Sequence, residues 1–339
     1  MKRWTLEDIG KLAGVSRSTV SRVINDHPHT SPAVRQRVEQ VIRETGYQPN
    51  SAARSLASSQ SRILGLVMPS LLQSAFADPY YALVIQAISQ ACIQHDYTPS
   101  LFLFQNAAEE AKMSQRLASS GLIDGLIVTA DTIDSQFVQM IQPYDIPFVQ
   151  IGRPQRESAS CISYVDVDNE AGAYLAGSHL LQQGYRRIGQ IATLHNTAGQ
   201  DRDAGFRRAL NDRGLPIDEA LIALSSFSEA SGYRAMQHLL PRQPEAVFAQ
   251  SDAIALGAIR AIRDSDLRVP EDIAVVGFDD MPLAASSSPP LTTVRQPIAR
   301  AGKLAVETLL DIIQTSPQPA RHIVLPVELV IRASSGAVS

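Results

Sequence analysis

Cysteines are scarce in this sequence of 339 residues, and long apolar runs are absent. The two cysteines, Cys92 and Cys161, lie in apolar segments without the spacing of a metal site, so we expect two reduced core residues. No apolar run approaches the ~20 residues that a membrane-spanning helix needs. Acidic residues lie near the N-terminus, where an export signal would require an apolar core. These absences predict a cytoplasmic protein that does not enter a membrane.

The sequence also lacks the motifs of the common enzyme classes. It contains no Gly-x-Ser-x-Gly elbow, no phosphate-binding loop and no His-Glu-x-x-His helix, and its seven histidines are scattered. Asp279 and Asp280 are sequence neighbours, and adjacency alone does not give two carboxylates the separation that a glycosidase needs. We expect no catalysis, no cofactor and no bound metal.

Charge is distributed unevenly along the chain, although the net charge is only −4. Residues 1–62 contain 10 Lys and Arg against 5 Asp and Glu, whereas the remainder contains 20 against 29. A basic head on an acidic body suggests that only the head meets a polyanion, since neutralising phosphates supplies the sequence-independent part of DNA affinity. Charge alone is weak evidence, because many solvated helical bundles are equally basic.

The head begins with the pattern of a short helix. Thr5 followed three residues later by Asp8 is typical of a capped helix start. Apolar residues then recur at helical spacing, at Leu6, Ile9, Leu12 and Ala13. The sequence therefore predicts a helix over about 6–13, ended by Gly14, which tolerates a positive φ.

A second helix follows, which the hydroxyl of Ser16 can cap. Its inward face carries Val20, Val23 and Ile24. Its other face presents short or cationic hydrogen-bonding groups, namely Arg17, Ser18, Thr19, Ser21 and Arg22. Such groups suit base edges and phosphates in a major groove, so this face has the character of a recognition helix.

A third helix is predicted from Ser31, as its cap, and Pro32, in its first turn, to Gly46. Its apolar residues repeat every three or four positions, at Val34, Val38, Val41 and Ile42. Three such helices can close one small core. A plain three-helix bundle with a polar surface is the alternative interpretation of this segment.

Residues 50–57 contain helix-forming residues but fall short of the ~12 that make an isolated helix even marginal in water. If they order only on DNA, Leu56 is the large apolar side chain available as a wedge between base steps in the minor groove, and Arg54 can meet phosphate. A flexible linker is the other interpretation.

The rest of the chain has the pattern of an α/β domain. Apolar runs alternate with helical patterns every 25 to 30 residues or so, which is typical of parallel strands joined by crossover helices. The candidate strands are 63–67, 100–104, 125–128, 147–151, 188–192, 246–249 and 273–277, with a last strand over 323–331. Their number fits two doubly wound sheets.

Ligands of doubly wound folds bind beyond the carboxyl ends of the strands. The residues just after each run are Asp78 to Tyr81, Gly152 and Arg153, Arg202 and Asp203, Phe227, Ser251 and Asp252, Asp279 and Asp280, and Gln296. Aromatic faces mixed with Arg, Asp and amide groups suit a polyhydroxylated ligand. Asp252 could instead cap the helix that follows it, and Asp280 could be an ordinary loop carboxylate.

The sequence resembles the lactose-repressor/galactose-repressor family of bacterial regulators over nearly its whole length. In the head, the resemblance rests on residues 5–9, 13–16, 19–25, 46–50 and 53–56. In the remainder, it rests on residues 124–127, 165–169, 184–188, 205–206, 231–233, 255–258, 267–270, 277–280 and 290–294. Pro69 and Gly152 depart from it, since some relatives place a Ser and an Asp there at the ligand.

The resemblance implies roles for individual residues. Arg17, Ser18 and Arg22 would read bases, and residues 50–57 would form a hinge helix that inserts Leu56 into a kinked operator. The complete set expected at DNA is Thr5, Ser16, Arg17, Ser18, Thr19, Ser21, Arg22, Asn25, Asn50, Ala53, Arg54 and Leu56. The set expected at the effector is Tyr80, Tyr81, Arg153, Arg202, Phe227, Ser251, Asp252, Asp279 and Gln296.

The expected architecture is an all-α helix-turn-helix head joined to an α/β effector domain that resembles periplasmic binding proteins and contains two doubly wound subdomains. We place the head at 1–49, the hinge at 50–60 and the effector-binding and dimerisation domain at 61–339. Within that domain, the N-subdomain is expected at about 61–163 and 297–325, and the C-subdomain at about 164–296 and 326–339.

The sequence thus predicts a ligand-responsive regulator that binds a palindromic operator as a homodimer, since it lacks the trailing heptads that join two lactose-repressor dimers. We expect a repressor of carbohydrate-utilisation genes that a sugar releases from DNA. A regulator that a purine or another metabolite activates as co-repressor is the alternative, and a solute-binding protein is the alternative from a different class.

Overall fold

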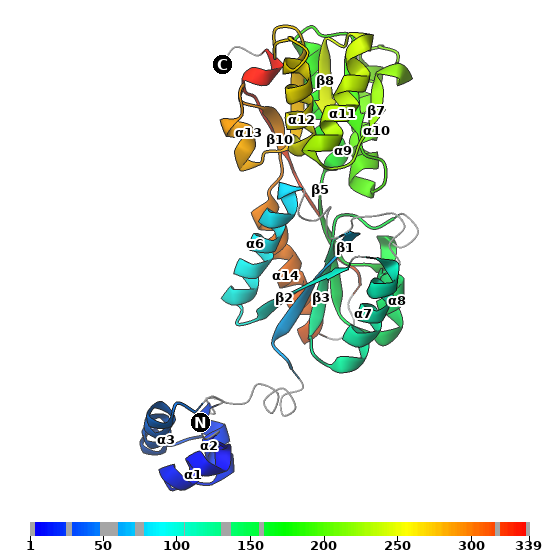
Figure 1. Cartoon of the computed structure of the whole chain (residues 1–339). Helices are drawn as coiled ribbons and strands as arrows, with labels where there is room; N and C mark the ends of the chain where they lie inside the picture. The colour runs from blue at the N-terminus through cyan, green and yellow to red at the C-terminus, as the bar shows by residue number, and fades with distance from the viewer. Residues whose placement is uncertain are drawn as a thin grey trace. The chain divides into compact units, whose positions relative to one another are not determined.

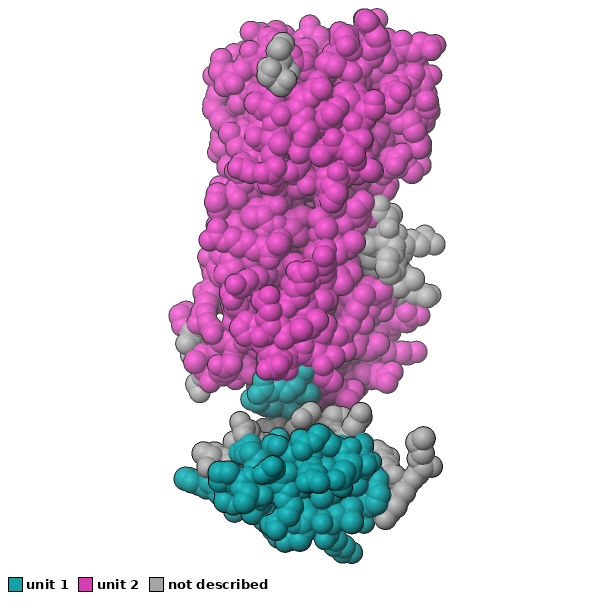
Figure 2. All heavy atoms as spheres, turned by 90° about the vertical axis from the view of Figure 1, so that its left-hand side faces the viewer, with its two compact units in different colours: residues 1–62 teal, residues 63–339 magenta. Residues whose placement is uncertain are grey.

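The protein was analysed as a computed structural model, which describes residues 4–24, 29–47, 60–71, 78–104, 106–129, 137–155, 159–315 and 319–336. Its contacts divide the chain into two compact units, Met1–Arg62 and Ile63–Ser339 (Figure 2).

The described residues of the first unit form the helices α1 (Leu6–Ala13), α2 (Arg17–Ile24) and α3 (Pro32–Thr45). The predicted capping box at the start of α1 is present, since the Asp8 backbone N–H donates to Thr5 Oγ1 and the Thr5 N–H donates to the Asp8 carboxylate. Gly14 ends α1 with a φ of +66°, a conformation that favours glycine. Local hydrogen bonds and a glycine therefore set the two ends of α1.

The three helices enclose one small core, as the sequence predicts. Its buried members are Ile9, Ala13, Val20, Val23, Val38 and Tyr47. Two expectations for this unit are wrong. Leu12 is 55% exposed rather than buried, because an eight-residue helix turns only part of its apolar stripe toward such a small core. The Ser31 side chain makes no capping hydrogen bond, so Pro32 at the first helical position marks the start of α3 by itself.

The second unit contains two six-stranded sheets, each with helices on both faces (Figure 1). We call the first sheet and its helices the N-lobe. Its strands, in the order β11-β5-β4-β3-β1-β2, are β1 (Ile63–Leu71), β2 (Thr98–Phe104), β3 (Gly125–Thr129), β4 (Phe148–Ile151), β5 (Tyr164–Val167) and β11 (His322–Leu325). Its helices are α6 (Pro79–Gln94), α7 (Ala107–Ser120), α8 (Phe137–Ile141) and α14 (Ile298–Gln314), with 3₁₀ turns η1 (Gln142–Tyr144) and η2 (Ala159–Cys161).

We call the second sheet and its helices the C-lobe. Its strands, in the order β12-β10-β9-β8-β6-β7, are β6 (Ile188–Ala192), β7 (Ile222–Leu224), β8 (Ala246–Ala249), β9 (Ala274–Asp279), β10 (Thr292–Arg295) and β12 (Glu328–Val330). Its helices are α9 (Asn169–Gln182), α10 (Thr197–Asp212), α11 (Glu229–Leu239), α12 (Asp252–Arg263) and α13 (Pro282–Ser286), with 3₁₀ turns η3 (Glu219–Leu221), η4 (Leu240–Arg242) and η5 (Ala333–Ser335).

Alternating side chains of the buried strands supply the two layers of core in each lobe. In β1, Leu64 and Leu66 pack with α6 and α14, whereas Val67 packs on the opposite face with α7 and α8. In the C-lobe, α11 and α12 cover one face and α9 and α10 cover the other. The predicted class of two doubly wound subdomains is therefore confirmed.

The chain crosses between the lobes three times, after β5, after β10 and after β11. The expected boundary at 163/164 is wrong by one strand, because β5 pairs with β4 and β11 in the N-lobe. The expected single strand over 323–331 is two strands in different sheets, β11 and β12, since Pro326 interrupts the run and cannot donate to a ladder. The prediction of a buried Cys161 is also wrong, because this residue is exposed, whereas Cys92 is buried.

Candidate functional site

The outward face of α2 carries the groups expected at DNA. Arg17, Ser18 and Arg22 are exposed, while Val20 and Val23 on the opposite face are buried. The two faces follow from helix geometry, because residues three or four positions apart lie on the same side of a helix. The face is free to meet a groove without disturbing the core of the head.

Hydroxyl groups organise the start of α2. Ser16 Oγ accepts the Thr19 backbone N–H at 3.2 Å and lies 2.8 Å from Ser18 Oγ and 2.9 Å from Thr19 Oγ1. The expected cap is therefore present, and Ser21 lies partly buried one turn further along the helix. Thr5 is exposed but engaged with Asp8 in the capping box of α1.

Arg17 forms an ion pair with Glu7 of α1 at 3.0 Å, with side chains that are 66% and 53% exposed. Exposed pairs of this kind contribute about 0 to 1 kcal/mol. Arg17 can therefore exchange Glu7 for a base or a phosphate at little cost. The other residues expected at DNA, Asn25, Asn50, Ala53, Arg54 and Leu56, lie outside the described residues.

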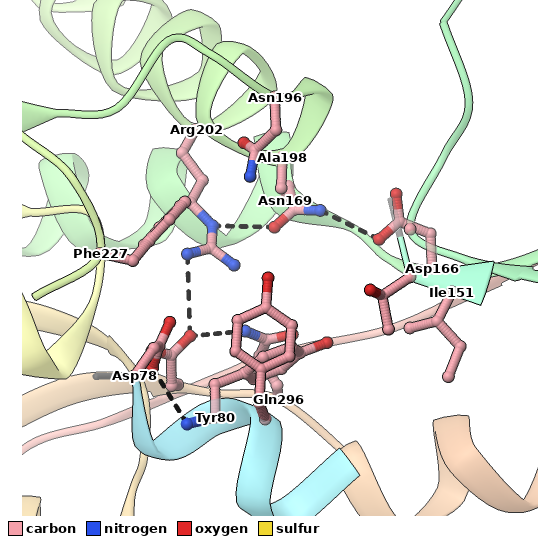
Figure 3. Close-up of a pocket in the computed structure, with 14 residues that line it drawn as sticks. Asp78, Tyr80, Ile151, Asp166, Asn169, Asn196, Ala198, Arg202, Phe227 and Gln296 are labelled. Carbon is pink, nitrogen blue, oxygen red and sulfur yellow. Dashed lines mark hydrogen bonds and ion pairs between the residues drawn. The ribbon is translucent and has the colours of Figure 1, made fainter. Parts of the chain in front are cut away.

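A pocket lies between the two lobes of the second unit (Figure 3). Its empty space is about 560 Å³, part of which is open to solvent. The N-lobe lines it with Asp78, Tyr80, Tyr81, Thr129, Ile151, Gly152 and Asp166. The C-lobe and the crossover segments line it with Asn169, Asn196, Ala198, Arg202, Phe227, Asp279 and Gln296. Six of the nine residues expected at the effector are among them.

Arg202 is the central cation of the pocket and is only 5% exposed. Its Nε donates to Asn169 Oδ1 at 2.8 Å, one of its terminal nitrogens donates to the Gln250 carbonyl oxygen, and its guanidinium stacks on the Phe278 ring. Gly205 makes this placement possible, because a Cβ there would lie 2.0 Å from the carbonyl oxygen of Glu170 on α9. The close approach of α10 to α9 brings Arg202, one turn earlier, beside Asn169.

Asp279 lies at the carboxyl end of β9, opposite Arg202. Its Oδ1 lies 3.7 Å from an Arg202 nitrogen and accepts the Gln296 side-chain amide at 2.6 Å. Burial raises the pKa of this carboxyl, and the Arg202 charge opposes that rise. Its φ of +123° is rarely adopted by residues with a side chain, and such strain is concentrated at ligand sites.

Asp166 presents a second carboxylate to the pocket, from the carboxyl end of β5. It accepts the backbone N–H groups of Val167 at 2.8 Å and Arg153 at 2.9 Å, and the Asn169 amide at 3.2 Å. Burial raises its pKa to about 6, and the two backbone hydrogen bonds limit the rise. Asn169 thereby links the Asp166 carboxylate to Arg202 across the crossover between the lobes (Figure 3).

Three aromatic side chains supply apolar surface to the pocket. The Tyr80 and Tyr81 rings meet edge to face at 5.6 Å, and Phe227 meets His195 in the same manner at 5.8 Å. Burial raises the pKa of the Tyr80 phenol, with the carboxylates of Asp166 and Asp279 adding to the effect. Tyr80 is therefore a neutral hydrogen-bonding group as well as an apolar one.

Three residues expected at the effector do not line the pocket. Ser251 is fully buried, and its hydroxyl caps α12 by accepting the Ile254 N–H. Asp252 instead accepts the Met281 N–H and the Thr293 hydroxyl, so it is held behind the pocket and does not cap α12.

Arg153 is the third of these residues, and its guanidinium turns away from the pocket. It forms a two-pronged ion pair with Asp201 of α10, at 2.7 to 3.2 Å. The Arg153 carbonyl oxygen also accepts the Thr197 hydroxyl at 2.6 Å. Arg153 therefore links the N-lobe to the C-lobe through this ion pair and hydrogen bond.

Asp78 and Gly152 line the pocket and were among the candidate positions after the strands, although not in the final effector set. The pocket residues that the sequence analysis did not name are Thr129, Ile151, Asp166, Asn169, Asn196 and Ala198. Asp166 and Asn169 follow or belong to β5, a four-residue strand that the apolar pattern does not reveal. Asn196 caps α10, so a polar cap shortly after the β6 run was the signal that could have identified it.

Two kinds of feature are absent from the described residues. None of their helices is long and apolar enough to span a membrane. In the same part of the chain, no cluster of three or more His, Cys, Asp or Glu side chains is placed to hold a metal ion.

Two family descriptions match the chain: "Bacterial regulatory proteins, lacI family" over residues 5–50, and "Periplasmic binding protein-like domain" over residues 178–335. The regulator CelR of Thermobifida fusca is 38% identical over 336 residues, which cover 98% of each chain. The repressor PurR of Yersinia pestis (strain Pestoides F) is 35% identical over 334 residues, which cover 97% of this chain and 96% of that protein.

Solved structures agree in fold over the whole length. A complex of the regulator CelR with cellobiose superposes with a TM-score of 0.78 at 36% identity, covering 98% of this chain and 100% of that one. The lac repressor dimer bound to operator and an anti-inducer superposes with a TM-score of 0.87 at 28% identity, covering 99% of this chain and 100% of that one. This chain therefore belongs to the LacI family of bacterial regulatory proteins and is a ligand-responsive, DNA-binding transcriptional regulator.

Proposed function

We propose that the protein is a repressor of carbohydrate-utilisation genes, acting in the cytoplasm as a homodimer on a palindromic operator, and that an unmodified sugar releases it from DNA. The observation that carries the proposal is the pocket, in which Arg202, Asp279 and Gln296 form a fixed polar cluster beside Tyr80 and Phe227. Such a cluster suits a ring with an apolar face and a rim of hydroxyls. The relative solved with cellobiose supports a sugar of that kind.

On DNA, the proposal assigns base reading to Arg17, Ser18 and Arg22 on the exposed face of α2. The neighbouring hydroxyls of Ser16, Thr19 and Ser21, with Thr5, would contact phosphate or fix the start of the helix. Two copies are needed because two recognition helices must meet successive half-sites in register. Leu56 and its neighbours at 50–57 are proposed as the hinge that orders at the operator centre.

The effector would act by stabilising one arrangement of the two lobes. The crossovers after β5, β10 and β11 are the points about which the lobes can rotate, and the pocket lies between them. Coupling of about 1 to 3 kcal/mol between effector and operator would change operator affinity 5- to 150-fold. That range is sufficient for a genetic switch.

A thermal-shift experiment on the full chain distinguishes a sugar from a purine. At about 100 times its Kd, the effector adds about 2.7 kcal/mol to the folded state. For a unit of this size, that gain raises Tm by about 5 °C. We expect this shift with cellobiose or another sugar at millimolar concentration, and none with hypoxanthine or guanine. Stabilisation by purines alone would replace the proposal with a co-repressed regulator similar to PurR.

Breaking the ion pair between the lobes tests whether closure contributes to effector affinity. Arg153→Gln is expected to weaken effector binding about 3- to 10-fold, because Asp201 then holds the closed arrangement less firmly. Calorimetric titration of the effector gives the measurement. Arg207→Gln is the matched control, since Arg207 lies on the same helix α10 but pairs within the C-lobe, with Asp203 and Glu219. Equal effects of the two substitutions would contradict the role of the bridge.

A further inference from the structure

Thr129 and Asp166 lie on the floor of the pocket in the N-lobe, on either side of Ile151 and Gly152. Thr129 is the last residue of β3, and Asp166 lies near the end of β5, with β4 between them. The registers place Thr129 opposite Ile151 and Ile151 opposite Val165, so the three strand ends form one row. Gly152, which follows β4, adds no side chain to this row. The Thr129 hydroxyl and the Asp166 carboxylate therefore line the same wall of the pocket, with Ile151 and Gly152 between them.

The Thr129 hydroxyl has no hydrogen-bond partner among the described residues, although its side chain is only 4% exposed. Buried hydroxyls are almost always hydrogen-bonded in native proteins, and an exception in a pocket points to a missing ligand or water. A ligand hydroxyl could donate to this oxygen and accept from its proton.

The Asp166 carboxylate is held in place by neutral groups only. Its donors are two backbone N–H groups and the Asn169 amide, and no described cation lies within ion-pair distance of it. The Arg202 charge acts on Asp166 without forming an ion pair with it, and the Arg153 guanidinium is paired with Asp201. Asp166 is thus a fixed acceptor with no ion-pair partner among the described residues.

The pocket as a whole carries more negative than positive groups. Asp78, Asp166 and Asp279 line it, against a single cation, Arg202. Arg202 donates to Asn169 and the Gln250 carbonyl oxygen and lies 3.7 Å from Asp279, so one carboxylate already offsets its charge. Repulsion between buried charges several ångströms apart is strong, because the local dielectric is low.

We infer that Asp166 and Thr129 determine specificity by binding hydroxyls of an uncharged sugar, and that the pocket rejects the phosphorylated form of the same sugar. The inference deepens the proposed function and rests on it. A phosphate within about 6 to 8 Å of Asp166 would be disfavoured by about 100-fold or more at an effective dielectric constant near 20. A neutral hydroxyl suffers no such repulsion and gains a charge-assisted hydrogen bond.

The test compares matched pairs of sugars on the full chain, namely cellobiose, glucose and ribose, each against its form phosphorylated on the terminal hydroxymethyl group. Operator release is followed by fluorescence anisotropy, and binding is followed by thermal shift. We expect at least one neutral sugar to act. Its phosphorylated form is expected to require a concentration at least about 100-fold higher.

Two variants locate the discrimination in the floor residues. Asp166→Asn should lower the affinity for the neutral sugar about 10-fold, because it removes the charge and keeps the shape of the side chain. It should also reduce, by about the same factor, the ratio of the effective concentration of the phosphorylated sugar to that of the neutral sugar. Thr129→Val should lower the affinity for the neutral sugar without altering this concentration ratio. Asp168→Asn is the matched control, since Asp168 lies outside the pocket and caps α9, a position that Asn fills equally well. Asp168→Asn should leave both the affinity for the neutral sugar and the concentration ratio unchanged.

The outcomes separate this inference from the proposed function. A phosphorylated sugar that acts as well as its neutral partner would overturn the inference alone. So would an unchanged ratio in Asp166→Asn, or a preference for glucosamine over glucose, which would indicate a cationic effector. If no member of any pair acts while a purine does, the proposed function fails, and the inference fails with it.

Discussion

A chain that lacks residues 1–62 is expected to lose specific operator binding by at least about 1,000-fold while retaining the effector affinity of the full chain within about twofold. The recognition face of α2 lies entirely in the removed unit, and the pocket is lined entirely by residues 78–296. The remaining unit should fold alone, because its four hydrophobic clusters contain no residue of the head.

Calorimetric titration of effector and fluorescence anisotropy with operator DNA measure the two affinities on both chains. Thermal melting of the truncated chain checks that it is folded. Specific operator binding by residues 63–339 would show that DNA recognition lies outside the helix-turn-helix. Loss of effector binding in a folded truncated chain would show that the head contributes to the pocket.

Arg202→Met is expected to abolish the effector response and to lower the free energy of unfolding by about 3 to 5 kcal/mol. The substitution leaves the buried Asp279 carboxylate without its cation and deprives Asn169 Oδ1 and the Gln250 carbonyl of their donor. Effector affinity should fall at least about 100-fold, since the fixed polar cluster is lost. The variant should still bind operator, because α2 is unaffected, and should no longer release it.

Urea unfolding gives the stability, and operator titration with and without effector gives the response. Arg208→Met is the matched control on the same helix, where the exposed Arg208 pairs with Glu170 and stacks on Tyr174, and its cost should not exceed about 1 kcal/mol. Adding Asp279→Asn to Arg202→Met should recover part of the lost stability, because it removes the unpaired charge. A variant at Arg202 that is stable and responds normally would contradict the assigned role.

The helices of the head could be predicted closely from the sequence, because their ends depend on local chemistry. The capping box at Thr5, the cap at Ser16 and the glycines at 14 and 46 act within a few residues. The exposure of Leu12 could not be predicted in the same way. It depends on how much of α1 the other two helices cover, which is a property of packing rather than of local sequence.

The two sheets could be predicted from buried apolar runs, and so could the four-residue strands β4 and β8, but three other short strands could not. β5, β7 and β10 contain three or four residues each and are held by their neighbours rather than by their own pattern. Missing β5 had a consequence for the site, because Asp166 and Asn169 could not be placed at a strand end. It also displaced the expected boundary between the lobes.

The rule that ligands bind beyond the carboxyl ends of strands located Arg202, Phe227, Asp279 and Gln296 correctly in the pocket. The rule does not determine where a long side chain turns. Arg153 follows β4 as expected, yet its guanidinium reaches across to Asp201, a partner 48 residues away that only the folded chain brings near. Ser251 likewise follows a strand, but its hydroxyl caps the next helix by accepting the Ile254 N–H and so does not face the pocket.

The central claim is that a ligand in the pocket between the lobes controls the affinity of the head for its operator. The most direct measurement is a titration of operator DNA with the full chain at fixed salt, with and without a saturating neutral sugar such as cellobiose. The account predicts that the sugar weakens operator binding about 5- to 150-fold and leaves binding to random DNA unchanged. An operator affinity that no sugar changes, in a chain that the same sugar stabilises, would contradict it.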